Sequence, residues 1–472
     1  MTKTLIALSV TLLLGGCSMA PDYQRPALPQ GAAWQSNQVE GEAAVSPWRQ
    51  QFLDPALQQL IGTALENNRD LRIAALNVEA YEARYRIQRA AQLPPLAANG
   101  SGTRQQGSDD LSSTGQGTIS SQYGANIGIT SYELDLFGRI QSLKDQALEN
   151  YLAQVETQRS TQIALIASVA NAYLTLLADQ ELLALSEATL ATEQESYGLT
   201  EHKYRLGAAS EMELAQGRTA LESAKVSLAQ YQRQVKQDRN GLALLLGTGV
   251  PALMTEPATL AEVQLAAIPV GAPSSLLQQR PDILAAEHSL KAANANIGAA
   301  RAAFFPTISL TATAGTASNQ LSGLFDGGTG TWTFMPQINL PIFDGGKRIA
   351  DLDVAEVSTR QAVASYEKSI QTAFKEVADT LGAQDDYQQQ LLAQQALVEA
   401  NQTYFKLAEV RYEKGVDSYL TRLDAQRSLF SAKQGLISTR LAQLSNQVAL
   451  YKAVGGGWQA ADAEGGKGEG QQ

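Results

Sequence analysis

The chain's only cysteine, Cys17, stands where a thiol can be covalently modified. It follows a segment with a positive charge at Lys3, an apolar run over Leu5–Leu14 and the small pair Gly15-Gly16. This order is typical of a cleavable secretory signal, and the apolar run is too short to span a membrane. The residues ending at Cys17 resemble a bacterial lipobox. The sequence therefore predicts that residues 1–16 are a signal peptide and that Cys17 is acylated, which anchors the chain by more than one fatty-acid chain.

Few other residues could do chemistry, and this excludes several classes of protein. With 36 basic and 47 acidic residues the net charge is −11, which argues against a nucleic-acid binder. The two histidines, His202 and His288, lie in predicted helices without neighbouring ligands, and five methionines form no cluster that would favour copper. The chain shows no GxSxG, HExxH, Walker-type loop or complete GxGxxG motif. We expect neither an enzyme nor a metal or cofactor site.

The sequence repeats itself once, with an offset near 208 residues. Tyr204–Ser210 matches Tyr412–Ser418, and Gly247 matches Gly455. A period this long indicates a duplicated half and not a solenoid of short units. The predicted repeats span residues 57–247 and 274–457.

Each repeat contains three proline-poor segments with an apolar residue every three or four positions, which predicts helices. They cover residues 57–93, 139–205 and 211–246, and then 274–304, 347–411 and 418–454. At about 1.5 Å per residue each middle helix is on the order of 100 Å long, a length typical of a coiled coil. The two shorter helices together match the long one, so we expect them to stack end to end beside it. Gly207 and Gly415 then mark the turns at the far tips.

Two strand-like runs lie between the first and second helix of each repeat. They cover about 96–103 and 121–136 in the first repeat, and about 307–315 and 331–343 in the second. Polar and apolar residues alternate in them, and Pro336 suggests a bulge or a local bend in the last. The remaining segments are an N-terminal lipid-anchored segment over 17–56, an equatorial crossover over 248–273 and a tail over 458–472 that we expect to be disordered.

Four alternating strands fit either a small sandwich with one buried face or part of a membrane barrel. Export, the predicted anchor and the long helices favour the barrel. Four strands cannot close a barrel, and open edges are not tolerated in hydrocarbon, so several copies must combine. Two copies give eight strands with a filled interior, whereas three give twelve and leave a lumen. We therefore expect a mainly helical fold that forms a homotrimeric 12-stranded barrel continued by a long helical tunnel. No later stretch has 18 consecutive apolar residues, so no transmembrane helix is expected.

Five motifs in order carry a resemblance to a known family. They are Pro21–Pro26, Tyr132–Arg139, Gln279–Asp282, Gly298–Pro306 and Leu340–Phe343. Together they resemble the TolC-like outer membrane factors, in the OprM/OprN group of outer-membrane efflux lipoproteins, and the similarity extends from Cys17 to about Trp458. Ser18, after the cysteine, resembles lipoproteins that are sorted to the outer membrane.

The resemblance implies the outer-membrane channel of a tripartite multidrug efflux pump in a Gram-negative bacterium. Its implied partners are two further copies of the chain, a periplasmic adaptor protein, an inner-membrane RND drug/proton antiporter and outer-membrane lipid, with no nucleic acid. It implies no catalytic residues and no cofactor. It also implies a periplasmic gate in which helices near the second tip bend inward.

The family pattern, carried over residue by residue, implies three gate residues and two docking turns. Leu420 and Asp424 would line the aperture from one helix face, and three copies of Asp424 would form a negative ring. Tyr412 matches a position that latches neighbouring helices. The adaptor-docking turns are Gly207, Ala208 and Ser210, and Gly415, Val416 and Ser418. Without the resemblance, Asp424 fits an ordinary solvated carboxylate equally well, and the turns fit plain helix connections.

Two other functions remain open from the sequence. The first is the channel of a type I protein secretion or another export system. The second is a structural periplasmic lipoprotein, which would explain the helices but not the alternating strands.

Overall fold

The computed structural model describes residues 18–27, 47–108, 110, 117–250, 259–268 and 280–456. The signal peptide, Cys17, the tail over 458–472 and parts of the crossover lie outside the described residues. The described chain divides into two compact units. The first contains residues up to Ala27, Asn77–Val155 and Ala285–Tyr366, and the second contains described residues of Leu28–Leu76, Glu156–Leu284 and Glu367–Gln472. The division into repeats stays a prediction.

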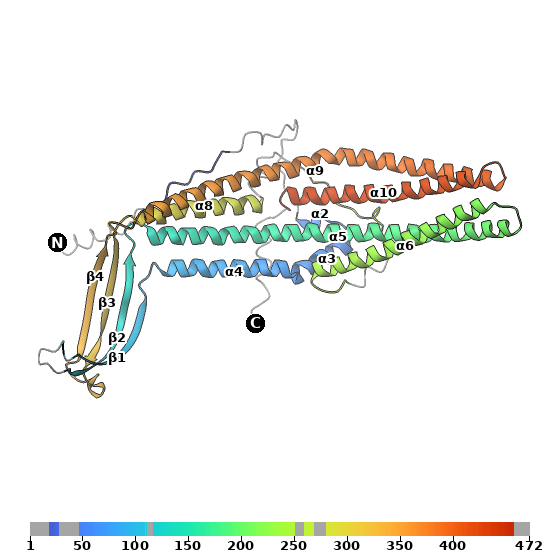
Figure 1. The fold of residues 1–472 in the computed structure, drawn as a ribbon. Helices are drawn as coiled ribbons and strands as arrows, with labels where there is room; N and C mark the ends of the chain where they lie inside the picture. The colour runs from blue at the N-terminus through green and yellow to red at the C-terminus, as the bar shows by residue number, and fades with distance from the viewer. Residues whose placement is uncertain are drawn as a thin grey trace. The chain divides into compact units, whose positions relative to one another are not determined.

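Helices dominate the described chain. The four strands form two pairs that are far apart in the sequence, and they lie side by side in one sheet (Figure 1). In chain order the elements are α2 (Trp48–Gln51), α3 (Pro55–Asn67), α4 (Arg69–Ala90), β1 (Leu96–Gln106), β2 (Ile119–Leu134), α5 (Arg139–Arg205), α6 (Glu211–Leu246), α8 (Pro281–Ala302), β3 (Thr307–Ser318), η3 (Leu321–Gly323), β4 (Gly330–Asn339), α9 (Lys347–Glu413) and α10 (Tyr419–Ala453).

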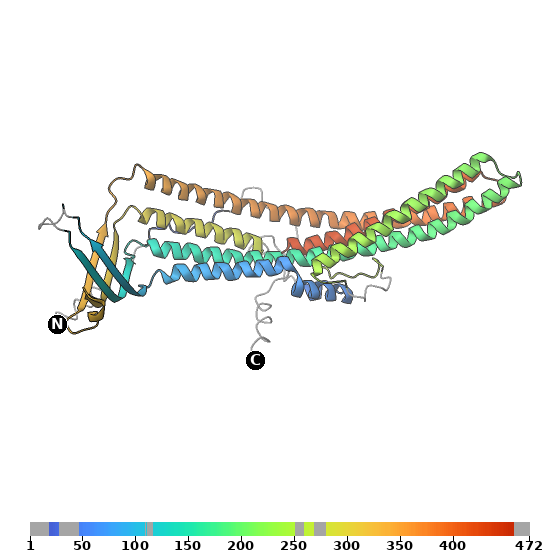
Figure 2. The same cartoon turned by 60° about the horizontal axis from the view of Figure 1, so that its bottom comes forward.

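The first unit contains one antiparallel sheet with strand order β1-β2-β3-β4 (Figure 2). Of the bulge or local bend expected at Pro336, the bulge is wrong, because β3 and β4 pair without a shift from Thr307 opposite Asn339 to Thr316 opposite Gly330. β4 is an edge strand, where a residue without an N–H is tolerated. The register shift lies instead between β2 and β3, at Ile129 to Tyr132.

The long helices follow the sequence pattern closely, but the first predicted helix is interrupted. α5 and α6 have the predicted bounds. The segment predicted as one helix over 57–93 forms α3 and α4, which are separated by Asn68 in an extended conformation (φ −64°, ψ 133°). The Asn68 side chain accepts a hydrogen bond from the Leu71 N–H at 2.9 Å, so Asn68 starts α4 as an N-cap.

The core of the second unit forms around the middle of α5. Val169, Ala170 and Leu174 are fully buried there, against Leu57 and Ile61 of α3 among others. One 18-residue window of α5 has a mean hydropathy of 1.5, enough in length and composition to cross a membrane, but 61% of it is buried inside the protein. Because most of this window is buried, packing against other helices explains the apolar character of α5.

Both pairs of short helices meet end to end in the second unit, and each junction is closed by one side chain. At the α6–α4 junction, the Asn68 amide donates to the carbonyl oxygen of Leu245 at 2.8 Å. At the α10–α8 junction, Arg280 Nη1 donates to the carbonyl oxygen of Ala453 at 2.7 Å. Each bond satisfies a helix carbonyl that has no partner within its own helix. Arg69 and Arg280 both lie 26 residues before a proline, Pro95 and Pro306, which makes them counterparts in the sequence. In the structure, however, Asn68 makes the bond that corresponds to that of Arg280, and Arg69 is exposed.

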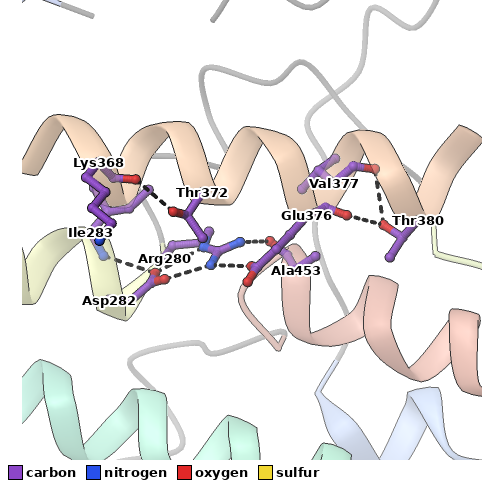
Figure 3. Close-up of polar contacts among 9 residues, drawn as sticks. All are labelled: Arg280, Asp282, Ile283, Lys368, Thr372, Glu376, Val377, Thr380 and Ala453. Atoms are coloured by element: carbon purple, nitrogen blue, oxygen red, sulfur yellow. Dashed lines mark hydrogen bonds and ion pairs between the residues drawn. The ribbon is translucent and has the colours of Figure 1, made fainter. Parts of the chain in front are cut away.

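Arg280 also joins α8 to α9 through two carboxylates (Figure 3). Its Nη2 lies 2.6 Å from Asp282 Oδ2 and 2.8 Å from Glu376 Oε2, while the arginine side chain is only 6% exposed. Burial alone would lower the pKa of Arg280, but the bonds and charges of the two carboxylates outweigh it and raise the pKa. Arg280 therefore stays charged and links three helices.

We expect Arg280→Met to lower the free energy of unfolding by about 2 kcal/mol, because it leaves a buried carbonyl and two carboxylates without their partner. This loss of unfolding free energy is smaller than for a fully buried ion pair because Asp282 and Glu376 are partly exposed. Thermal unfolding followed by circular dichroism measures the change. Arg69→Met is the matched control and should leave Tm unchanged; equal Tm values for both variants would contradict the role given to Arg280.

Candidate functional site

The sheet separates apolar from polar side chains onto its two faces. Directly opposed residues of antiparallel strands share a face. On one face, Ile308, Leu310, Ala312 and Ala314 of β3 lie opposite Ile338, Pro336, Phe334 and Trp332 of β4. On the other, Thr307, Ser309, Thr311 and Thr313 lie opposite Asn339, Gln337, Met335 and Thr333. Apart from Met335, the alternation is complete over these pairs.

The apolar face is exposed instead of forming a core. Trp332 is 79% exposed, Ile338 68% and Leu96 of β1 71%. Monomeric soluble proteins rarely expose continuous apolar surface of this kind. Strands that are apolar on one face and polar on the other are typical of a transmembrane barrel, whose apolar face contacts lipid.

Both outer edges of the sheet are open. Within the described residues, β1 pairs only with β2 and β4 only with β3. The unpaired N–H and C=O groups along each edge favour addition of another strand, and in hydrocarbon they must be paired.

The two helix tips have the same geometry 208 residues apart. Gly207 and Gly415 both have φ +73°, which favours glycine. The Ala208 N–H donates to the Lys203 carbonyl at 2.8 Å, and the Val416 N–H donates to the Arg411 carbonyl at 2.9 Å. Together with the hydrogen bonds that the N–H groups of Gly207 and Gly415 donate, these two bonds form a Schellman motif at each tip.

The helices that follow the tips begin at serine caps. Ser210 accepts from the Glu213 N–H and Ser418 from the Thr421 N–H. The six tip residues predicted to bind an adaptor thus form sharp, capped turns, and Val416 is 61% exposed. Their contact with a partner stays a prediction.

The three predicted gate residues occupy two different environments. Leu420 and Asp424 are both exposed on α10, and Asp424 Oδ1 lies 3.9 Å from Arg427 Nη1. Tyr412, at the end of α9, packs against the Tyr419 ring at a centroid distance of 5.5 Å, with Lys203 Nζ 4.9 Å above its own ring. Tyr412 therefore contacts α5 and α10, and its role as a latch stays a prediction.

The sequence reasoning missed two buried residues beside Tyr412. Tyr419 and Arg422 lie on the face of α10 that packs into the protein. Arg422 donates to Ser196 Oγ of α5 at 2.7 Å and to Glu409 Oε1 of α9 at 3.3 Å. The Tyr419 hydroxyl lies 3.3 Å from the same Ser196 Oγ. We call Tyr412, Tyr419, Arg422, Ser196 and Glu409 the latch cluster.

The latch cluster belongs to a polar stretch in the core of α5. Alternating steps of three and four residues, the spacing of a coiled-coil seam, pass through Ser186, Thr189, Glu193, Ser196 and Thr200. All but Thr189 are buried, and Thr189 is half-buried. Polar seam residues fix register at a cost in stability. This periodicity is the signal that could have identified Ser196 from the sequence.

A second polar group on α5 is a carboxyl pair with α6. Burial raises the pKa of the Asp179 carboxyl to about 7, with further increases from its hydrogen bond to Asp238 and the charge of that residue. Nearby, Tyr231 of α6 accepts a hydrogen bond from Gln434 of α10 at 3.0 Å.

Within the described residues, no group of three or more histidine, cysteine or acidic side chains could hold a metal ion.

Comparisons with known proteins agree with this geometry. The chain matches the family model of the outer membrane efflux protein over residues 60–248 and 272–456. It is 57% identical over 466 residues to the probable efflux pump outer membrane protein TtgC of Pseudomonas putida, covering 97% of this chain and 96% of that protein. It is 44% identical over 457 residues to outer membrane protein OprJ of Pseudomonas aeruginosa, covering 96% and 95%. The open state of the Neisseria gonorrhoeae MtrE outer membrane channel has a TM-score of 0.83 and 40% identity, covering 93% of this chain and 98% of that one.

The chain belongs to the outer membrane efflux protein family. It is an outer-membrane channel component of an efflux pump and has no enzymatic role. The resemblance found in the sequence, the fold class with a barrel-type sheet and long helices, and the outer-membrane location are confirmed.

The raised pKa of Asp179 predicts a pH dependence of stability. In the unfolded chain this carboxyl has its ordinary pKa near 3.8, so between that pH and about 7 the folded state holds a proton that the unfolded state has lost. The stabilisation is fully present below the unfolded value and is lost as the pH rises through 7. We expect the Tm of the wild type to fall between pH 5 and pH 8.

Asp179→Asn removes this titration, so its Tm should change less over the same pH range. Asp385→Asn, at an exposed position of α9, is the control and should follow the wild type. Parallel curves for the Asp179→Asn variant and the wild type would show that the carboxyl pair does not control this pH dependence. Calorimetric scans at fixed ionic strength measure it.

Proposed function

We propose that three copies of this chain close a 12-stranded barrel around an aqueous pore. The supporting observation is the sheet with one apolar face and two open edges. Pairing β4 of one copy with β1 of the next satisfies both edges and turns every apolar face outward to lipid. Two copies would give eight strands and fill the interior with side chains, whereas three leave room for solutes.

The trimer is the exit channel of a tripartite pump. Drugs reach it from an inner-membrane RND drug/proton antiporter through a periplasmic adaptor protein. The helices form a tunnel on the periplasmic side, and the capped tip turns at Gly207–Ser210 and Gly415–Ser418 dock the adaptor. Acylation of Cys17 anchors each copy to outer-membrane lipid.

The gate is formed by α10 of each copy. The latch cluster holds the first turns of α10 against α5 and α9, because Arg422 bonds to both helices at once. Leu420 and Asp424 are exposed near the latch cluster and line the aperture in the trimer. Hydrogen bonds and ring contacts of the latch cluster hold the closed gate. When the gate opens, these side chains can exchange partners without exposing a large apolar core.

Conductance through a planar lipid bilayer tests the channel. The purified full chain should insert as a trimer and give discrete single-channel currents. Insertion without any current at any voltage would contradict the pore. Conduction by monomers would contradict the trimer and leave the family membership untouched.

Asp424→Ala should raise single-channel conductance and make cells sensitive to vancomycin, which is too bulky for the closed gate. The change removes three negative charges and three side chains from the aperture. Asp386→Ala removes an exposed carboxylate of α9 instead and is the matched control. Equal conductance and equal vancomycin sensitivity in the two variants would contradict a gate role for Asp424.

A further inference from the structure

α4 and α9 are the outermost helices beside the sheet. The helices follow the order of the strands, because α4 leads into β1 and α9 follows β4, the two edge strands (Figures 1 and 2). One face of each outer helix is covered within the chain. Val78, Tyr81 and Tyr85 of α4 are half-buried, and Ala355 and Tyr366 of α9 are buried. The opposite face of each helix is exposed.

The exposed face of α4 carries a seam of apolar residues with the spacing of a coiled coil. Alternating steps of three and four residues pass through Ile73, Leu76, Ala80, Ala83 and Ile87. Ala83 is half-buried and the other four are exposed, with Ile87 at 66% and Leu76 at 51%. Such a seam is the surface on which helices pair.

α9 carries a corresponding seam on its own exposed face. Alternating steps of four and three residues pass through Ala350, Val354, Val357, Gln361 and Ala364, all of them exposed. Val354 is 65% exposed and Val357 41%. Two unpartnered seams, one on each outermost helix, therefore remain in a single copy of the chain.

A row of charged residues lies along one flank of each seam. Each row has three residues seven positions apart, and their signs alternate. The rows are Arg72, Glu79 and Arg86 on α4, and Asp353, Arg360 and Glu367 on α9. Seven residues make two helical turns, so each row stays on one side of its helix. Among the described residues, Arg86 lies 3.9 Å from Glu82, and no ion pair is found for the other five.

The two rows are complementary when the helices lie antiparallel. α4 runs toward the sheet and α9 runs away from it, so packing the two seams together brings the two charged flanks to the same side. Counted from the helix ends nearest the sheet, Arg86 is four residues in and Asp353 is six. Glu79 is eleven residues in and Arg360 is thirteen. The third pair keeps the same difference of two residues, about 3 Å, so one register matches all three pairs.

We propose that α4 of one copy packs against α9 of the next copy as an antiparallel coiled coil whose register is fixed by three ion pairs. The pairs are Arg86 with Asp353, Glu79 with Arg360, and Arg72 with Glu367. This inference rests on the proposed trimer, in which β1 of one copy pairs with β4 of the next, and it names the helix surfaces that continue that contact. A slip of seven residues would place like charges opposite each other, so the rows select one register as well as one partner.

Charge reversal at the middle pair tests the register. In Glu79→Arg, two positive charges face each other at every contact between copies. At low salt the detergent-extracted trimer should then dissociate at least about fivefold faster on heating than the wild type. Arg360→Glu should have the same effect. The double variant Glu79→Arg/Arg360→Glu should return to the wild-type rate, because opposite charges meet again.

Size-exclusion chromatography of heated samples measures the trimer that remains. Glu399→Arg, at an exposed position of α9 outside the charged row, is the matched control and should behave like the wild type. At high salt the differences between the variants should shrink, because exposed charges are screened.

The outcomes separate this inference from the assembly on which it rests. A wild-type chain that elutes as a monomer would contradict the trimer and the inference with it. A stable wild-type trimer that neither single reversal weakens would overturn the ion pairs and leave the trimer standing. Single reversals that weaken the trimer without recovery in the double variant would show that Glu79 and Arg360 do not face each other, which would also overturn the register.

Discussion

A backbone N–H or C=O group cannot remain unpaired in hydrocarbon, and this constraint governs the sheet and everything built on it. The four strands expose an apolar face that only lipid suits, yet leave two edges open. One copy of the chain cannot satisfy both conditions alone. This is why we propose assembly, and in that proposal the lumen follows from the number of copies that closes the ring.

The core of α5 changes its chemistry along its length. Around Val169 and Leu174 it is apolar and is held by burial, which has no directional preference. From Ser186 to Thr200 the buried positions are polar, and specific hydrogen bonds such as Arg422 to Ser196 hold them. A core of the first kind maintains a rigid wall, whereas one of the second kind can exchange discrete partners. The latch cluster lies in the second part, and the gate that we propose there would need bistable contacts of this kind.

The sequence predicts most of the local structure because local rules control it. The bounds of α5 and α6 follow from composition and from the glycine and serine signals at Gly207 and Ser210. The break at Asn68 also follows a local rule, since asparagine is a favoured N-cap. Pro336 causes no bulge because β4 is an edge strand of the sheet, where a residue without an N–H is tolerated. The position of β4 in the sheet cannot be read from the sequence. Tyr419 and Arg422 could not be found from α10 alone, because their partner Ser196 lies more than 220 residues away and only folding brings it close.

Cross-linking of the outer strands tests the central claim most directly. In a Cys17→Ser background, cysteine pairs scanned along the two edges, such as Ser101→Cys on β1 with Thr333→Cys on β4, are oxidised in the assembled membrane protein. We expect at least one register to give disulfide-linked dimers and trimers on a denaturing gel, while single-cysteine variants stay monomeric. Disulfides that form only within one chain, at every register, would contradict the pairing of β4 of one copy with β1 of the next.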